Sequence, residues 1–81
     1  MQVSIELLGK QRVITKTDSI DMPITEKTTV NDAIEYVRQQ YPDLDLDEGM
    51  VLIAVNKRIA SLDRILRSND TILFLPFISG G

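Results

Sequence analysis

The chain has 81 residues, of which 43% are hydrophobic and 26% charged, a composition typical of one small globular domain. Its net charge of -3 argues against nucleic-acid binding, and no apolar run is long enough to span a membrane. Without cysteine or histidine, it has no thiolate nucleophile, disulfide, imidazole base or imidazole metal ligand. We therefore expect a cytoplasmic protein that binds no metal or cofactor and has no self-contained catalytic site.

Two strands are predicted near the start of the chain. Residues 3–7 alternate between apolar and polar side chains, and residues 20–25 do the same, as strands with one buried face do. The polar residues 9–18 between them predict a loop, so the two strands should form a hairpin. Pro23 lacks an N–H group, which favours an edge position for the second strand.

One main helix is predicted next. Apolar side chains recur at helical spacing from residue 30 to residue 41, and Thr29 is the natural N-cap, with Asp32 near the positive end of the helix dipole. The helix should end just before Pro42. The acidic residues 42–49 that follow lack the spacing of a helix-loop-helix calcium site, so they predict a solvated loop.

Three more strands are predicted in the second half of the chain. Residues 50–56 form a nearly continuous apolar run, as central strands do. A turn at Asn56 and Lys57 leads to a short strand that contains Ile59. Asn69 and Asp70 predict another turn, after which residues 71–77 form the last strand.

This order of elements predicts an α+β fold of the ubiquitin-like β-grasp type, in which a mixed sheet packs on one main helix and the final strand returns beside the first. We expect residues 1–81 to form a single domain, with residues 77–81 as a flexible tail. In the last strand, Ile72 and Phe74 face one way, while a second apolar set, Leu73, Leu75 and Phe77, faces the other. A single helix can cover only one of these two sets.

The tail ends in Gly80 and Gly81. Glycine has no Cβ, so an extended diglycine can enter a slot that any side chain would block. The terminal carboxylate could then reach a recessed active site in a partner. The alternative is a terminus that is frayed and has no function.

The chain resembles the sulfur-carrier branch of the ubiquitin-like superfamily, most closely the small subunit of molybdopterin synthase. The resemblance is carried by three segments, residues 29–34, 53–57 and 69–81. The most specific feature is the ending, in which a proline, a short apolar pair and a small residue precede the diglycine. One departure is Phe77, because the family often has a second proline after the position of Pro76.

The resemblance implies that a ubiquitin-activating-type adenylating enzyme uses ATP to adenylate Gly81. A sulfurtransferase would then supply the sulfur that converts the adenylate into a thiocarboxylate, and Gly80 would allow the tail to thread into its partners. The resemblance further implies that the loaded tail enters the large subunit of molybdopterin synthase, in a heterotetramer. There its sulfur would build the molybdopterin dithiolene, so this chain would be a substrate and subunit and not the catalyst.

The resemblance also implies a docking surface. Ile59, Leu75 and Phe77 match the hydrophobic contact patch of the family, and Ile78 and Ser79 would follow them into the partner. The alternative is that these apolar residues fill the rear of a small core. Four basic residues lie close to them in the sequence: Lys57, Arg58, Arg64 and Arg67. These four either pair with acidic groups of the activating enzyme or form a solvated rim.

Three other functions stay open at this point. A thiamine-pathway sulfur carrier shares the fold, the diglycine and the activation chemistry, although the apolar pair after Pro76 favours the molybdopterin pathway. A ubiquitin-like modifier would join Gly81 to a lysine of a target protein, starting from the same adenylate. An interaction module would use the sheet to bind a partner and leave both glycines idle.

Overall fold

A five-stranded mixed sheet and one long helix form most of the structure, a computed structural model that describes residues 1–44, 46 and 51–76. The strands are β1 (Gln2–Glu6), β2 (Ser19–Pro23), β3 (Val51–Val55), β4 (Arg58–Ile59) and β5 (Thr71–Pro76). The helices are α1 (Lys10–Thr15) and α2 (Val30–Gln40). The α+β class and the β-grasp order of elements predicted from the sequence are confirmed.

The strands lie in the order β2-β1-β5-β3-β4. β1 pairs antiparallel with β2 and parallel with β5, so the last strand does return beside the first. β3 pairs antiparallel with β5 and with β4. The apolar run from residue 50 to residue 56 therefore gives an interior strand, but β5 and not β3 occupies the middle of the sheet. β2 is an edge strand, as Pro23 predicted.

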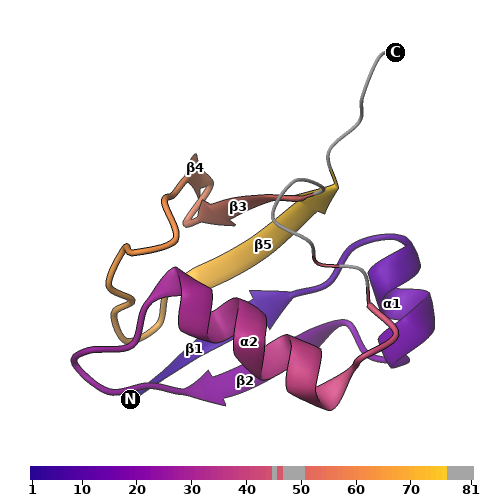
Figure 1. Cartoon of the computed structure of the whole chain (residues 1–81), viewed down its shortest axis with the longest axis horizontal. Helices are drawn as coiled ribbons and strands as arrows, with labels where there is room; N and C mark the ends of the chain where they lie inside the picture. The colour runs from indigo at the N-terminus through magenta and orange to yellow at the C-terminus, as the bar shows by residue number, and fades with distance from the viewer. Residues whose placement is uncertain (45, 47–50, 77–81) are drawn as a thin grey trace.

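Helix α2 lies across one face of the sheet (Figure 1). It turns Val30, Ala33, Ile34 and Val37 into the core. The buried side chains that the strands contribute to the same core alternate along each strand, and they include Val3, Ile5, Ile20, Met22, Ile53, Val55, Ile72 and Phe74. The face of the sheet opposite α2 carries the intervening residues.

A capping box begins α2. The Asp32 N–H donates to Thr29 Oγ1 at 3.3 Å, and the Thr29 N–H donates to Asp32 Oδ2 at 2.9 Å. Two of the N–H groups that a helix start leaves unpaired are thereby satisfied. The predicted N-cap is confirmed, and the helix ends at Gln40, before Pro42.

Residues 9–18, for which the sequence predicts a loop, contain helix α1, so this prediction is wrong. The residues that α1 buries are Gln11 and Thr15, whereas Val13 is 75% exposed. Its inward face is polar and its outward face partly apolar, which is the reverse of the pattern from which helices are recognised. Lys16 ends the helix in the left-handed conformation, with φ of 61°.

The two predicted turns are confirmed. Asn56 and Lys57 have positive φ values of 51° and 72° and join β3 to β4 as a two-residue hairpin turn. Asn69, with φ of 71°, directly precedes Asp70 and the start of β5. Asparagine tolerates this left-handed conformation better than most residues, which explains its use at both turns.

Candidate docking surface and tail site

β5 leads to the tail. Its last residues pair with β3, Leu75 opposite Leu52 and Pro76 opposite Val51. Five residues with predicted roles lie outside the described part of the chain: Phe77, Ile78, Ser79, Gly80 and Gly81. The structure therefore describes the strand from which the tail continues and the surface beside it.

Four aliphatic side chains lie together on the sheet face opposite α2. Leu52 of β3 is opposite Leu75 of β5, and Ala54 of β3 is opposite both Leu73 and Ile59. Residues that are directly opposite in antiparallel pairs share a face of the sheet. Ile59 is 62% exposed and Leu52 43% exposed, while Leu73 and Leu75 are half-buried. We name Leu52, Ile59, Leu73 and Leu75 the outer patch.

The structure brings together the two described residues that were predicted to bind a partner, Ile59 and Leu75. Their binding role stays a prediction, but neither of them is buried in the core. Leu52 was not singled out from the sequence, because residues 50–56 form a nearly continuous apolar run in which the two faces of the strand look alike. Since Ile53 and Val55 fill the core, a period of two would have placed Leu52 on the opposite face.

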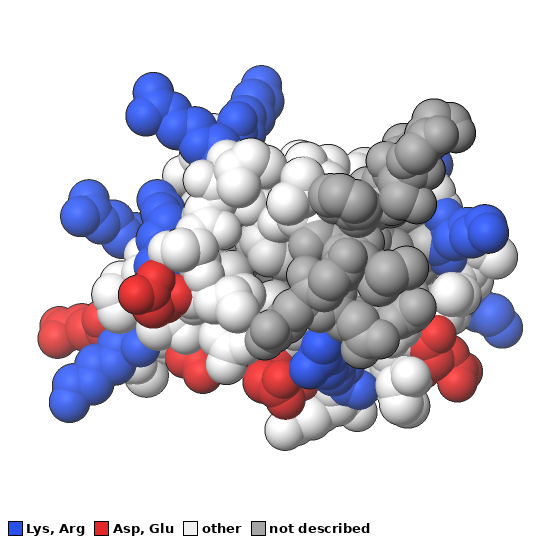
Figure 2. Space-filling model, turned by 45° about the horizontal axis from the view of Figure 1, so that its top comes forward, with Lys and Arg blue, Asp and Glu red and all other residues white. Residues whose placement is uncertain are grey.

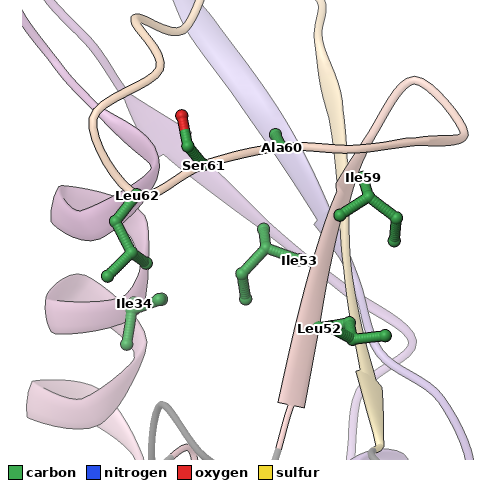
Figure 3. Close-up of a pocket in the computed structure, with 7 residues that line it drawn as sticks. All are labelled: Ile34, Leu52, Ile53, Ile59, Ala60, Ser61 and Leu62. Carbon is green, nitrogen blue, oxygen red and sulfur yellow. The ribbon is translucent and has the colours of Figure 1, made fainter.

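A hollow of about 170 Å³ opens at the edge of the sheet beside the outer patch. It forms beside the first half of β3, with which β4 is too short to pair. Among the residues that the structure describes, the last hydrogen bond at this edge is the one that the Ala60 N–H donates to the Ile53 carbonyl oxygen at 2.9 Å. Figure 3 shows Leu52 and Ile59 on one side of it and Ile34 and Leu62 on the other. The hollow therefore extends the apolar surface from the outer patch toward α2.

Polar residues border the outer patch on its other side. Glu6 of β1 is the partner of Leu73 in the parallel ladder. Glu6 and Leu73 line a second hollow, of about 300 Å³, together with Asn56, Lys57 and Thr71. In the view of Figure 2, basic side chains lie at the upper left, and acidic side chains lie among further basic ones in the lower half. The apolar surface thus lies next to an exposed carboxylate and an exposed ammonium group, as in the polar rim of a binding interface.

Asp70 ties the turn before β5 to the turn after β3. Its carboxylate accepts hydrogen bonds from the Arg67 backbone N–H at 2.8 Å, from Asn56 Nδ2 at 2.8 Å and from Arg64 Nη1 at 3.4 Å. Burial by itself raises the pKa of Asp70, but these donors outweigh it and hold the pKa below its usual value. The stabilisation is therefore present above the pKa of the unfolded chain and is lost as the pH falls through the lower folded-state pKa.

The same network fixes the β3–β4 turn that carries Ile59. The Thr71 N–H donates to Asn56 Oδ1 at 2.9 Å, so one asparagine side chain holds both Asp70 and the start of β5. Arg64, one of the four basic residues near the predicted surface, pairs with Asp70 within the chain. Lys57, Arg58 and Arg67 are exposed. Local patterns predicted turns at Asn56 and Asp70 but contained no signal that the two side chains bond to each other.

No group of three or more potential metal ligands occurs among residues 1–44, 46 and 51–76. The acidic loop predicted for residues 42–49 lies only partly within this range. In the same described part of the chain, neither helix has the length and apolar character required to cross a membrane.

The chain belongs to the ThiS family, whose family model matches residues 5–81. It is 34% identical over 84 residues to the molybdopterin synthase sulfur carrier subunit of Dictyostelium discoideum, across 99% of this chain and 96% of that protein. It is 30% identical over 66 residues to the protein of the same name in Mycobacterium tuberculosis, across 82% and 80% of the two chains. The resemblance to sulfur carriers is thereby confirmed.

Solved structures share the fold. Small archaeal modifier protein 1 of Methanosarcina acetivorans superposes with a TM-score of 0.80 at 24% identity, covering 99% of this chain and 96% of that one. A chain from the complex of subunits 1 and 2 of the molybdopterin-converting factor of Helicobacter pylori has a TM-score of 0.66 at 23% identity, with both chains fully covered. At these identities the likeness establishes the β-grasp fold alone, which a protein named as a modifier shares with a subunit of a molybdopterin-converting factor.

Proposed function

We propose that this chain is the sulfur carrier subunit of a molybdopterin synthase and that it carries sulfur as a thiocarboxylate on Gly81. The observation that carries the proposal is the pair of curated relatives with this name, one of which matches over almost its whole length. The family match supports it further, because it extends through the diglycine. Both relatives favour molybdopterin synthesis over the thiamine pathway and over protein modification.

The chemistry follows from the weakness of a carboxylate as an electrophile. A terminal oxygen of Gly81 would attack the α-phosphorus of ATP on an adenylating enzyme, releasing pyrophosphate and forming a mixed anhydride. Hydrosulfide released by a sulfurtransferase would then attack the acyl carbon, AMP would leave with the electrons of the broken C–O bond, and loss of the S–H proton would give the thiocarboxylate. Activation divides one difficult substitution into two easier ones. Gly80 would keep the approach to this carbon free of side chains.

The partner that receives the sulfur would be the large subunit of the synthase, which would also provide the active site. In this proposal the chain binds neither ATP nor another cofactor, and its own role is not catalytic. The absence of histidine and cysteine from the sequence supports this division of labour, because the usual general base and thiolate must then come from a partner.

The outer patch would hold the large subunit. Two of its aliphatic side chains belong to β5, the strand that leads to the tail, and the other two lie on β3 and β4, so one partner can contact the patch and take up the tail together. Exposed apolar side chains gathered in this way are typical of an interaction site. The Helicobacter pylori structure, a complex of subunits 1 and 2, supports an assembly of this kind.

Intact-mass measurement tests the proposal. The full chain would be isolated from its native host without reducing or hydrolytic treatment, beside a variant that lacks Gly80 and Gly81. We expect a species that is heavier by the difference between sulfur and oxygen, located at Gly81 and discharged by hydroxylamine. The truncated variant should show no such species.

Other outcomes would assign other functions. Adducts that link Gly81 to lysines, with a plain carboxylate on the free protein, would establish a modifier. A thiocarboxylate that supports thiazole formation but yields no dithiolene with the large subunit and its pyranopterin precursor would establish a thiamine-pathway carrier. If neither thiocarboxylate nor adducts form and the truncated variant keeps partner function, the chain is an interaction module.

A further inference from the structure

The ladder between β1 and β5 stops before β5 does. The two strands pair from Ser4 opposite Thr71 to Glu6 opposite Leu73, whereas β5 continues to Pro76. The Ser4 N–H donates to the Asp70 carbonyl oxygen at 3.0 Å. In a parallel ladder, equivalent bonds recur at every second residue of each strand. Extended by four residues, this register would bring the Leu8 N–H to the carbonyl oxygen of Phe74.

The side-chain amide of Gln11 lies between those two groups. The Leu8 N–H donates to Gln11 Oε1 at 3.1 Å, and Gln11 Nε2 donates to the Phe74 carbonyl oxygen at 2.9 Å. A carboxamide offers the same acceptor and donor as a peptide group. Gln11 therefore supplies the next rung of the ladder at the point where the two backbones have separated.

This rung is buried and well supported. Gln11 is 8% exposed and Phe74 is fully buried, so without Gln11 the Phe74 carbonyl would lose its partner away from water. Thr15 Oγ1 donates to the backbone carbonyl oxygen of Gln11 at 2.8 Å, a bond that does not involve the side-chain amide. On the opposite edge, β3 holds the same stretch of β5 through Leu52 and Val51.

We propose that Gln11 is a positioning residue for the tail: its amide holds the end of β5 in place, so that the tail starts from a fixed position relative to the outer patch. This inference rests on the function proposed above. Reaction at a docked terminus depends strongly on orientation, whereas docking depends on surface contacts away from the terminus. Loss of the Gln11 rung should therefore slow adenylation of Gly81 without weakening the binding of the adenylating enzyme.

The test compares two substitutions in the full-length chain. Gln11→Met keeps the length and burial of the side chain but removes both hydrogen bonds of the rung. Thr15→Val is the matched control, because Thr15 is similarly buried in the same helix, and its side chain donates to the backbone carbonyls of Gln11 and Thr17 instead of to β5. Both variants would be assayed at a temperature at which circular dichroism shows them fully folded.

Two readouts separate positioning from stability. The first is ATP–pyrophosphate exchange by the adenylating enzyme of the same organism, measured over a range of carrier concentrations. For Gln11→Met we expect kcat to fall about tenfold with KM within about twofold, and for Thr15→Val we expect neither to change by more than about twofold. The second is amide hydrogen exchange, which should lose protection at Leu75 but not at Ile72 in Gln11→Met alone.

The remaining results would overturn the inference in distinguishable ways. Equal kinetics of the two variants, or a change confined to KM, would show that Gln11 does not position the tail. Unchanged protection at Leu75 would show that the rung does not hold β5. If the wild-type chain supports no ATP–pyrophosphate exchange, the proposed function fails and the role of Gln11 in activation falls with it. The amide hydrogen exchange at Leu75 still decides whether the rung holds β5.

Discussion

Substitution of Ile59 by alanine tests the outer patch as a docking surface. The substitution removes the side chain beyond Cβ, and each buried carbon of this kind contributes about 0.8 kcal/mol. Ile59 is 62% exposed in the free chain, so most of its contribution is still available to a partner. Ile59→Ala should therefore weaken binding of the large subunit by about 1.5 kcal/mol, roughly tenfold in Kd. The part that is already buried limits the loss of folding stability to about 1 kcal/mol.

Isothermal titration of the large subunit into the full-length chain measures this effect. Ile65→Ala is the matched control, because Ile65 is also exposed, at 46%, but bridges to Thr29 at the start of α2 and is not part of the outer patch. We expect the control to bind like the wild-type chain. Equal weakening by both variants, or no weakening by Ile59→Ala, would refute the assignment of the docking surface.

Three further results are expected. Asp70→Asn should lower the free energy of unfolding in urea at neutral pH by about 2 kcal/mol. It should also flatten the loss of stability that the wild-type chain shows as the pH becomes acidic, and an unchanged slope of unfolding free energy against pH would contradict the lowered pKa of Asp70. Thr29→Ala should cost about 1 kcal/mol of unfolding free energy by removing the cap of α2, and unaltered urea midpoints would show that the capping box contributes nothing. Gly81→Ala should leave the Tm unchanged while reducing the thiocarboxylate yield measured by mass, because the added Cβ obstructs threading and the position follows the last residue of β5 by five residues. A normal yield would show that the activating enzyme accepts a side chain there.

The sequence predicted the elements whose apolar periodicity coincides with burial. The alternation around Val3 and Ile5 predicted β1, and the stripe from Val30 to Val37 predicted α2. Helix α1 gave no such signal, because the residues that it buries, Gln11 and Thr15, are polar, and Gln11 joins it to β5 by a hydrogen bond. Polar inward faces are recognisable only once the groups that they bond to are known.

The site was predictable in kind and only partly in detail. The resemblance named Ile59 and Leu75, but what places them on one surface is the pairing of both β4 and β5 with β3. Such register depends on contacts between segments far apart in the chain, which local patterns do not report. The same limit applies to Arg64, which the sequence placed near the surface and the structure pairs with Asp70.

The outer patch has a consequence for quality control during synthesis. Two of its residues, Leu73 and Leu75, belong to β5, the strand that joins the β1–β2 and β3–β4 pairs into one sheet. Two-stranded ribbons are at best marginally stable alone, so the surface cannot form until the ribosome has added residues 71–76. A partner that recognises this surface would thus reject unfinished chains and engage only those already extended to the start of the tail.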